Sequence, residues 1–133
     1  MVLVDTSVWI RYFHGLEPYL FEVSDLLTRD QTAGHELVYG EILIGDRGGL
    51  KDFLVTYEQL YQAKMVPHEE VLRLVRKESL HGVGINWIDA HLLASAVAED
   101  LQLWTADRLR HGRQRLRHRL QMNRPVPVAA VDV

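Results

Sequence analysis

Apolar positions along the chain form two patterns: short unbroken runs, and longer stretches with helical spacing. Val2-Leu3-Val4 is an unbroken run and residues 101–104 are nearly so, which is typical of strands buried on both faces. Residues 61–66 form another candidate strand, which ends at Pro67. Residues 126–130 contain a proline and are compatible with an edge strand. The sequence therefore predicts several short strands separated by longer segments.

Apolar residues with helical spacing predict that helices fill those longer segments. Helices are expected to start at Asp5-Thr6-Ser7 and to cover residues 16–28, 35–45, about 50–60, 68–80 and 89–98, with another in the arginine-rich segment along a seam of Leu109, Leu116 and Leu120. The segment 89–98 is apolar nearly all round and should be buried. Strands alternating with helices predict a three-layer α/β/α domain with a short, mostly parallel sheet. One such domain accounts for residues 1–133.

The composition narrows the functional classes. Apolar residues make up 47% and charged residues 25% of the chain, as in an ordinary globular protein. The absence of cysteine excludes disulfides and thiolate metal sites. The N-terminus lacks the basic start of a signal peptide, and no apolar run approaches the ~18 residues of a membrane helix. These features predict a cytoplasmic protein with no membrane partner.

Charge is distributed unevenly along the chain. Residues 1–107 contain 8 basic and 17 acidic residues, whereas residues 108–133 contain 7 basic residues and 1 acid. Six arginines fall between Arg108 and Arg119. Clustered arginine is suited to binding phosphates and releasing counterions. A solvated helix face, or a patch that contacts the acidic body or a protein partner, is the alternative interpretation.

Two of the predicted strands are each followed by an aspartate. Asp5 comes directly after the strand at residues 2–4, and Asp107 lies three residues after the strand at residues 101–104. Because ligands of open α/β sheets gather at the carboxyl ends of strands, both aspartates are candidate site residues. A carboxylate in this position is also a common helix N-cap, and the sequence leaves that alternative open.

Glu41 and Asp89 are two further acidic candidates. On a helix, Glu41 shares its face with Leu37, Val38 and Ile44, and no Lys or Arg lies within one turn. A carboxylate on such a face is costly to bury unless a cation, strong donors or water meets it. Asp89 opens a helix that has no polar face for solvent. A first-turn acid that favours the helix dipole is its alternative interpretation.

Four carboxylates that converge repel one another strongly unless a divalent cation lies between them. Oxygen-only ligands select hard ions such as Mg²⁺ or Mn²⁺. Such an ion can activate water and stabilise charge on a phosphodiester. The acidic residues therefore favour a metal-dependent hydrolase of phosphodiesters, although their spacing alone does not fix whether they converge.

Four blocks of sequence surround these acidic residues. They are Asp5-Thr-Ser-Val-Trp-Ile, Gly40-Glu41-Ile-Leu-Ile-Gly45, Trp87-Ile-Asp89-Ala-His-Leu-Leu-Ala-Ser95 and Leu103-Trp-Thr-Ala-Asp107. In order and spacing, over about residues 1–110, the blocks resemble the four motifs of PIN domains. The most similar members are the VapC-type toxins of bacterial toxin–antitoxin pairs.

The resemblance implies an endoribonuclease that uses one or two Mg²⁺ or Mn²⁺ ions, forms a homodimer and is inhibited by a cognate antitoxin. The residues that match the family's acidic quartet are Asp5, Glu41, Asp89 and Asp107. Thr105 matches a supporting hydroxyl residue, and Thr6 or Ser7 matches the small polar residue after the first aspartate. The segment after Asp107 is denser in arginine than the family pattern. Its candidates for contact with the RNA backbone are Arg108, Arg110, Arg113, Arg115 and Arg117.

Two other functional classes compete with this hypothesis. A Mg²⁺-dependent phosphatase or phosphotransferase would use Asp5 as nucleophile, but the sequence lacks a second aspartate two residues later. A binding module for RNA or protein would keep the fold with an inactive site, but all four acids are present. Glu36 or Asp46 would replace Glu41 as ligand if the helix register differed. His91 is expected to be packed or to lie at the rim of the site, and the three tryptophans Trp9, Trp87 and Trp104 are expected to be core residues and not platforms for base stacking.

Overall fold

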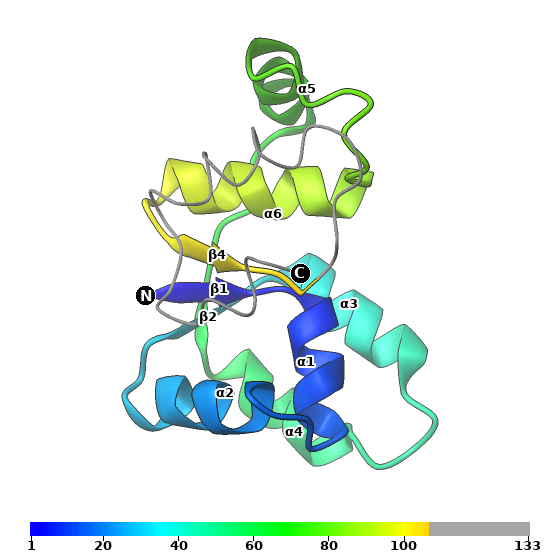
Figure 1. Cartoon of the computed structure of the whole chain (residues 1–133), viewed down its shortest axis with the longest axis vertical. Coiled ribbons are helices and arrows are strands. Elements are labelled where there is room, and N and C mark those ends of the chain that lie inside the picture. Colours follow the sequence, from blue (N-terminus) through cyan, green and yellow to red (C-terminus); the bar gives the residue numbers. More distant parts are fainter. Residues whose placement is uncertain (107–133) are drawn as a thin grey trace.

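A parallel sheet of four short strands forms the centre of the computed structural model, which describes residues 1–106. The strands are β1 (Val2–Val4), β2 (Thr32–Gly34), β3 (Tyr61–Gln62) and β4 (Gln102–Trp104). They lie in the order β3-β2-β1-β4, and every neighbouring pair is parallel. Helices cover both faces of this sheet (Figure 1). The prediction of a three-layer α/β/α fold is therefore confirmed.

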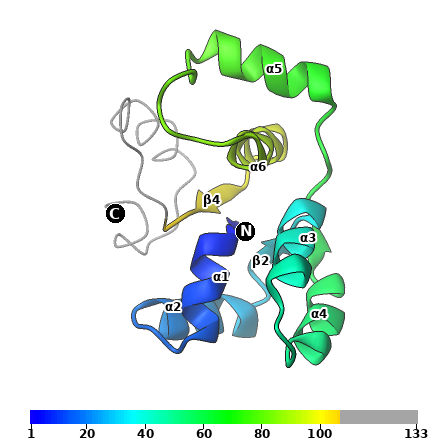
Figure 2. The same cartoon turned by 90° about the vertical axis from the view of Figure 1, so that its right-hand side faces the viewer.

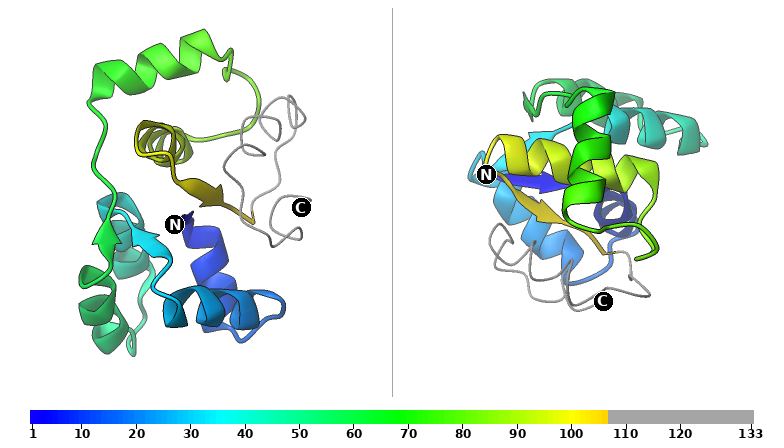
Figure 3. Two further views of the ribbon diagram at one scale, coloured as in Figure 1. Left: turned by 90° about the vertical axis from the view of Figure 1, so that its left-hand side faces the viewer. Right: turned by 90° about the horizontal axis from the view of Figure 1, so that it is seen from above.

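Six helices connect the strands in the described part of the chain. They are α1 (Thr6–Phe13), α2 (Tyr19–Thr28), α3 (Glu36–Gly45), α4 (Lys51–Glu58), α5 (His68–Lys77) and α6 (Trp87–Ala98). Helices α1 and α2 pack together on one side of the sheet, and α6 lies on the other side with α5 against it (Figures 1 and 3). Helix α3 contacts both α1 and α4. All six agree with the helices predicted from sequence, to within a few residues at their ends.

The core lies between the sheet and these helices. All three residues of β1 are buried. Trp9 and Trp104, which lie far apart in the sequence, are both fully buried. Every residue of α6 from Ala90 to Ala96 is buried, which confirms the prediction for that helix. Trp87 is an exception, because 41% of its surface is exposed at the start of α6. The prediction that all three tryptophans are core residues was therefore wrong for Trp87, which packs instead against the rings of two histidines.

Strand β2 was not predicted from sequence. Its three residues, Thr32, Ala33 and Gly34, carry no bulky apolar side chain, yet all three are buried. Strand β3 is shorter than the predicted 61–66, since only its first two residues pair with β2. The reason is that β2 ends at Gly34, whose carbonyl accepts a last bond from the backbone N–H of Ala63. Beyond that point β3 has no strand to pair with.

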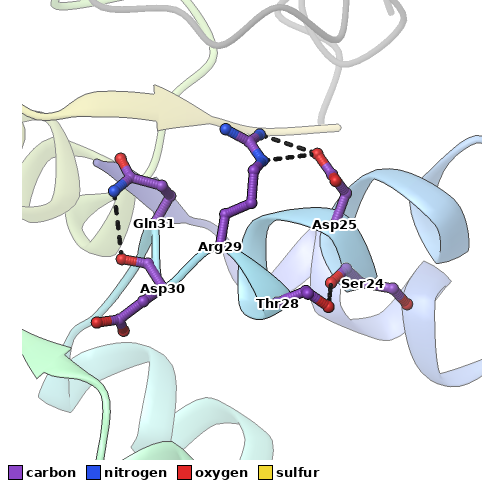
Figure 4. Close-up of polar contacts among 6 residues, drawn as sticks. All are labelled: Ser24, Asp25, Thr28, Arg29, Asp30 and Gln31. Carbon is purple, nitrogen blue, oxygen red and sulfur yellow. Dashed lines mark hydrogen bonds and ion pairs between the residues drawn. The ribbon is translucent and has the colours of Figure 1, made fainter.

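Polar contacts mark the turn that leads from α2 into β2 (Figure 4). Arg29 pairs with Asp25 one helical turn earlier at 2.9 Å, and the Thr28 hydroxyl donates to the Ser24 carbonyl. Asp30 then adopts a positive φ of 55°, which reverses the chain direction. The exposed ion pair contributes only about 0.3–0.5 kcal/mol, so the turn mainly sets where β2 begins.

Several sequence predictions concern residues outside the described range. They include Asp107, the arginine-rich segment with its proposed helix, and the edge strand at residues 126–130. Within residues 1–106, no helix is both long enough and apolar enough to cross a membrane.

Candidate active site

The candidate site lies at the carboxyl ends of β1 and β4, at the topological switch point of the sheet, where successive connections run to opposite sides of β1. From β1 the chain proceeds to β2 on one side, and β4 later inserts on the other side of β1. Asp5 follows β1 and Thr105 follows β4, so both lie at this switch point, where open α/β sheets bind ligands. The Thr105 hydroxyl donates to Asp5 Oδ2 at 2.9 Å, and the Asp5 amide donates to the Trp104 carbonyl at 2.9 Å.

A second hydroxyl holds the same carboxylate oxygen. Ser7 Oγ donates to Asp5 Oδ2 at 2.7 Å and accepts a bond from the Ala106 amide at 3.0 Å. Ser7 therefore connects α1 to the chain that leaves β4. Asp5 is only 4% exposed, and its side chain makes no capping bond to α1 although it occupies the N-cap position. Asp5 is thus the N-cap residue of α1 by position, as the alternative interpretation had it, but its carboxylate accepts from these hydroxyls instead of capping the helix.

Glu41 joins this group through the residue next to Asp5. Thr6 Oγ1 donates to Glu41 Oε1 at 2.6 Å, which connects α1 to α3. Glu41 and Leu37 are half-buried and Val38 is fully buried, but Ile44 is 88% exposed. The prediction that Glu41 lies on a packed apolar face therefore holds for the first part of α3 only. The C-terminal turn of that helix extends away from the sheet (Figure 1).

His35 positions the helix that carries Glu41, and sequence reasoning missed it. This fully buried histidine is the N-cap of α3, where its Nδ1 accepts from the Leu37 amide at 3.1 Å. Its Nε2 lies 3.0 Å from Ser95 Oγ in α6, and that hydroxyl donates to the Lys64 carbonyl. Because Nδ1 accepts a bond, the ring proton belongs on Nε2 and the bond to Ser95 is a donated one. His35 thus connects α3 to α6 across the core.

Burial keeps this imidazole neutral. Loss of hydration disfavours the charged form, and the neighbouring His91 acts in the same direction, so the pKa of His35 falls to about 4. Glu99 opposes the shift only partly. The only sequence signal for His35 was its place at the start of the helix predicted for residues 35–45.

Asp89 is placed differently from the other two acids. It lies in the first turn of α6 and forms a capping box with Asn86, whose amide donates to Asp89 Oδ2 at 3.1 Å. The helix-start interpretation of Asp89 is thus confirmed. Within residues 1–106, no three Asp, Glu or His side chains lie close enough together to hold a metal ion. Thr6 thus links the segments that carry Asp5 and Glu41, and Asp89 has a capping role at the start of α6.

Comparison with known proteins assigns the family. The family model "PIN domain" matches residues 2–110. The chain belongs to the PIN-domain family. It is also 40% identical over 109 residues to Ribonuclease VapC32 of Mycobacterium tuberculosis, in strains CDC 1551/Oshkosh and H37Rv. That alignment covers 81% of this chain and 86% of the relative. The resemblance drawn from the four sequence blocks is thereby confirmed.

The donor set of this PIN domain is chemically suited to a hard cation. Hydroxyl groups bind one oxygen of each acid, whereas Asp5 Oδ1 and Glu41 Oε2 accept no hydrogen bond from any residue up to 106. Neither acid forms an ion pair with a described Lys, Arg or His. A carboxylate that is 4% exposed and has no cationic partner among residues 1–106 is costly unless a ligand or another residue neutralises it. Such oxygens fit Mg²⁺, which takes few protein carboxylates and keeps several waters.

Proposed function

We propose that this PIN domain is a Mg²⁺-dependent endoribonuclease and the toxin of a toxin–antitoxin pair. The observation that carries the proposal is the pair of acids at the switch point, each with one oxygen left for a ligand. The name of its relative, Ribonuclease VapC32, supports RNA as the substrate. Mn²⁺ is expected to replace Mg²⁺, because both ions prefer oxygen ligands.

Asp5 and Glu41 would hold the ion, with Asp89 and Asp107 completing the acidic quartet. When bound, the ion supplies positive charge that stabilises the phosphodiester as its negative charge builds up, and it favours deprotonation of the attacking water. The contribution of the chain is orientation. Ser7 and Thr105 restrain the Asp5 carboxylate through Oδ2, and Thr6 restrains the Glu41 carboxylate through Oε1. Arg108 and the arginines that follow it would hold the RNA backbone.

A hydrolysis assay with three substrates tests the proposal. Purified protein is incubated with a mixed RNA pool, with DNA of the same sequences and with a phosphate monoester, each in Mg²⁺ and in EDTA. We expect internal cleavage of RNA that stops in EDTA and returns with added Mg²⁺ or Mn²⁺. Hydrolysis of the monoester alone would favour a phosphatase. Binding of RNA without cleavage in either metal would favour an inactive binding module.

The proposed partners are a second copy of the chain and a cognate antitoxin protein. This part rests on the family resemblance, which is an analogy rather than a contact seen in the structure. Co-expression with the neighbouring reading frame should yield a stable complex, and light scattering of the isolated chain should give the mass of a dimer. A monomer at tens of micromolar that captures no neighbouring gene product would contradict this assignment.

A further inference from the structure

A cavity of about 500 Å³ opens directly beside the candidate site. Thr6 and Glu41, which are hydrogen-bonded to each other, form part of its wall. The rest comes from α1, from the C-terminal half of α3 and from the loop at residues 46–50 that leads to α4 (Figure 2 shows these elements). The volume lies within the range of ligand pockets in proteins. A ligand in this cavity would therefore contact Thr6 and Glu41, which also belong to the candidate site.

Part of the cavity lining is apolar. Ile10, Phe13, Ile42 and Leu50 line it, and the Phe13 ring packs edge-to-face on Phe53 with centroids 4.7 Å apart. Ile10 is 46% exposed although it lies one helical turn from Thr6. Apolar side chains beside an acidic residue suit a ring system better than a second phosphate.

The lining of the cavity also includes a cation that pairs with no described acid. Arg47 lies in the loop at residues 46–50 and forms no ion pair within the described range. The loop itself is held in shape, since Asp46 Oδ1 accepts from the Gly48 amide at 2.8 Å. Gly48 and Gly49 both adopt φ values above 100°, which other residues rarely do. Arg47 is thus presented from a defined loop.

We propose that this cavity binds one unpaired base of the RNA substrate, the base next to the scissile phosphate, and that Arg47 reads it. The inference rests on the proposed ribonuclease function. A base and its own phosphate are separated by a single sugar, so a cavity that shares Thr6 and Glu41 with the candidate site is at the right position. Single-stranded RNA is recognised through unstacked bases packed against apolar or aromatic side chains. Guanine fits Arg47 best, because its O6 and N7 present two acceptors to one guanidinium group.

Mapping of RNA ends after cleavage tests the proposal. A pool of randomised RNA is digested by the wild type, by Arg47→Gln and by Ile10→Trp, which would fill the cavity. The wild type should show guanine enriched at one position next to the cut. Arg47→Gln should erase that enrichment and lower kcat/KM on the preferred sequence roughly 5- to 150-fold, as expected for loss of a bidentate base contact. Ile10→Trp should lower it by a similar factor.

Two control variants match these changes at a distance. Arg76→Gln removes an exposed arginine from α5, and Val97→Trp enlarges a side chain in α6 that is 52% exposed. Neither residue lines the cavity, so both variants should keep the wild-type sequence preference. Circular dichroism of all four variants shows whether each is folded. Because Ile10 and Arg47 are exposed, neither substitution should unfold the chain.

The outcomes separate this inference from the proposed function. Mg²⁺-dependent cleavage with the same flanking preference in the wild type and in both cavity variants would overturn the base pocket alone. A wild type with no preference at any flanking position would do so as well. Cleavage unchanged by the variants together with lost binding of the antitoxin would assign the cavity to a protein partner. A wild type that cuts no RNA would overturn both proposals.

Discussion

At the scale of single residues, the site depends on which oxygen of Asp5 remains available. Two hydroxyls occupy Oδ2, and the Ser7 hydroxyl also satisfies the buried Ala106 amide. Asp5→Asn should keep those contacts, because an amide can still bond to rotatable hydroxyls. It removes the negative charge that a cation needs, so RNA cleavage in Mg²⁺ should fall at least about a hundredfold with little change in Tm. Asp52→Asn, at an exposed position of α4, is the matched control. A folded Asp5→Asn protein that retains a tenth of the activity would contradict the assignment.

The acids of the site were predictable from sequence for a physical reason. A carboxylate directly after a buried strand, or on a helix without a neighbouring cation, needs an explanation that can be read from spacing. His35 gave no such signal, because its partners Ser95 and Lys64 lie far along the chain. Arg47 and Ile10 were missed for the same reason, since their common cavity exists only when α1 and α3 are brought together.

His35 should make stability depend on pH in a defined direction. Its pKa is about 4 in the folded protein against 6.5 for the free side chain, chiefly because of burial. As the pH falls, His35 therefore becomes protonated near pH 6.5 in the unfolded chain but only near pH 4 in the folded protein. The stabilisation is fully present above pH 6.5 and is lost as the pH falls towards 4, by about 3 kcal/mol at most.

The variant His35→Asn isolates this contribution. Asparagine keeps a cap for α3 but does not titrate in this range. Urea unfolding at several pH values between 4 and 7 should show a shallower fall in stability on acidification than in the wild type. Parallel curves for the two proteins would mean that His35 does not control this dependence.

At the scale of secondary-structure elements, replacing two glycines by alanine should change the stability of the protein in opposite directions. A β-carbon at Gly34, in β2, would lie 2.5 Å from Gln62 Nε2 and 3.0 Å from Tyr57 Cε1, so a neighbour must move. Gly34→Ala should cost about 1–3 kcal/mol. A β-carbon at Gly40, inside α3, would meet nothing within 4 Å. Gly40→Ala should therefore stabilise the protein by about 0.4–1 kcal/mol through the unfolded chain. Thermal unfolding should give a lower Tm for Gly34→Ala and a higher Tm for Gly40→Ala. A change of Tm in the same direction for both variants would contradict this account.

The same glycine explains why one strand escaped prediction while the helices did not. Helices such as α5 carry apolar residues with a clear period, and α6 is apolar nearly all round because its residues from Ala90 to Ala96 are buried. Strand β2 has no such pattern, since close packing against Tyr57 and Gln62 requires small residues there. For Trp87 the sequence pattern was misleading in the other direction. Its apolar neighbours indicated a buried position, but at the start of α6 the side chain is 41% exposed.

At the scale of the whole molecule, the acids of the site should couple metal binding to stability. Mg²⁺ that binds only the folded protein raises its stability by mass action. Glu41→Gln should remove most of that gain, and in metal-free buffer it should be as stable as the wild type or more so, because repulsion among nearby carboxylates decreases. Melting curves with and without Mg²⁺ compare the two proteins, with Asp52→Asn as the control. An equal Mg²⁺-dependent rise in Tm would show that Glu41 is not a ligand.

The charge of the whole molecule predicts where RNA is held. The described residues 1–106 contain eight basic and sixteen acidic side chains, so this part of the chain repels a polyanion outside the metal site. The counterbalancing charge follows it, in the six arginines between Arg108 and Arg119. Changing Arg113, Arg115 and Arg117 together to glutamine should weaken RNA binding on every sequence, because phosphate contacts carry no sequence information.

Salt dependence distinguishes this effect from a loss of chemistry. Each lost phosphate contact should lower the slope of log affinity against log salt by about 0.7 for single-stranded RNA, so the triple variant should lose up to about 2 in slope. The rate at saturating RNA should change far less than in Asp5→Asn, because the acids are untouched. Binding titrations at several salt concentrations, combined with single-turnover cleavage, measure both quantities. A triple variant with wild-type affinity and slope would assign the arginines to the antitoxin or to a second subunit instead.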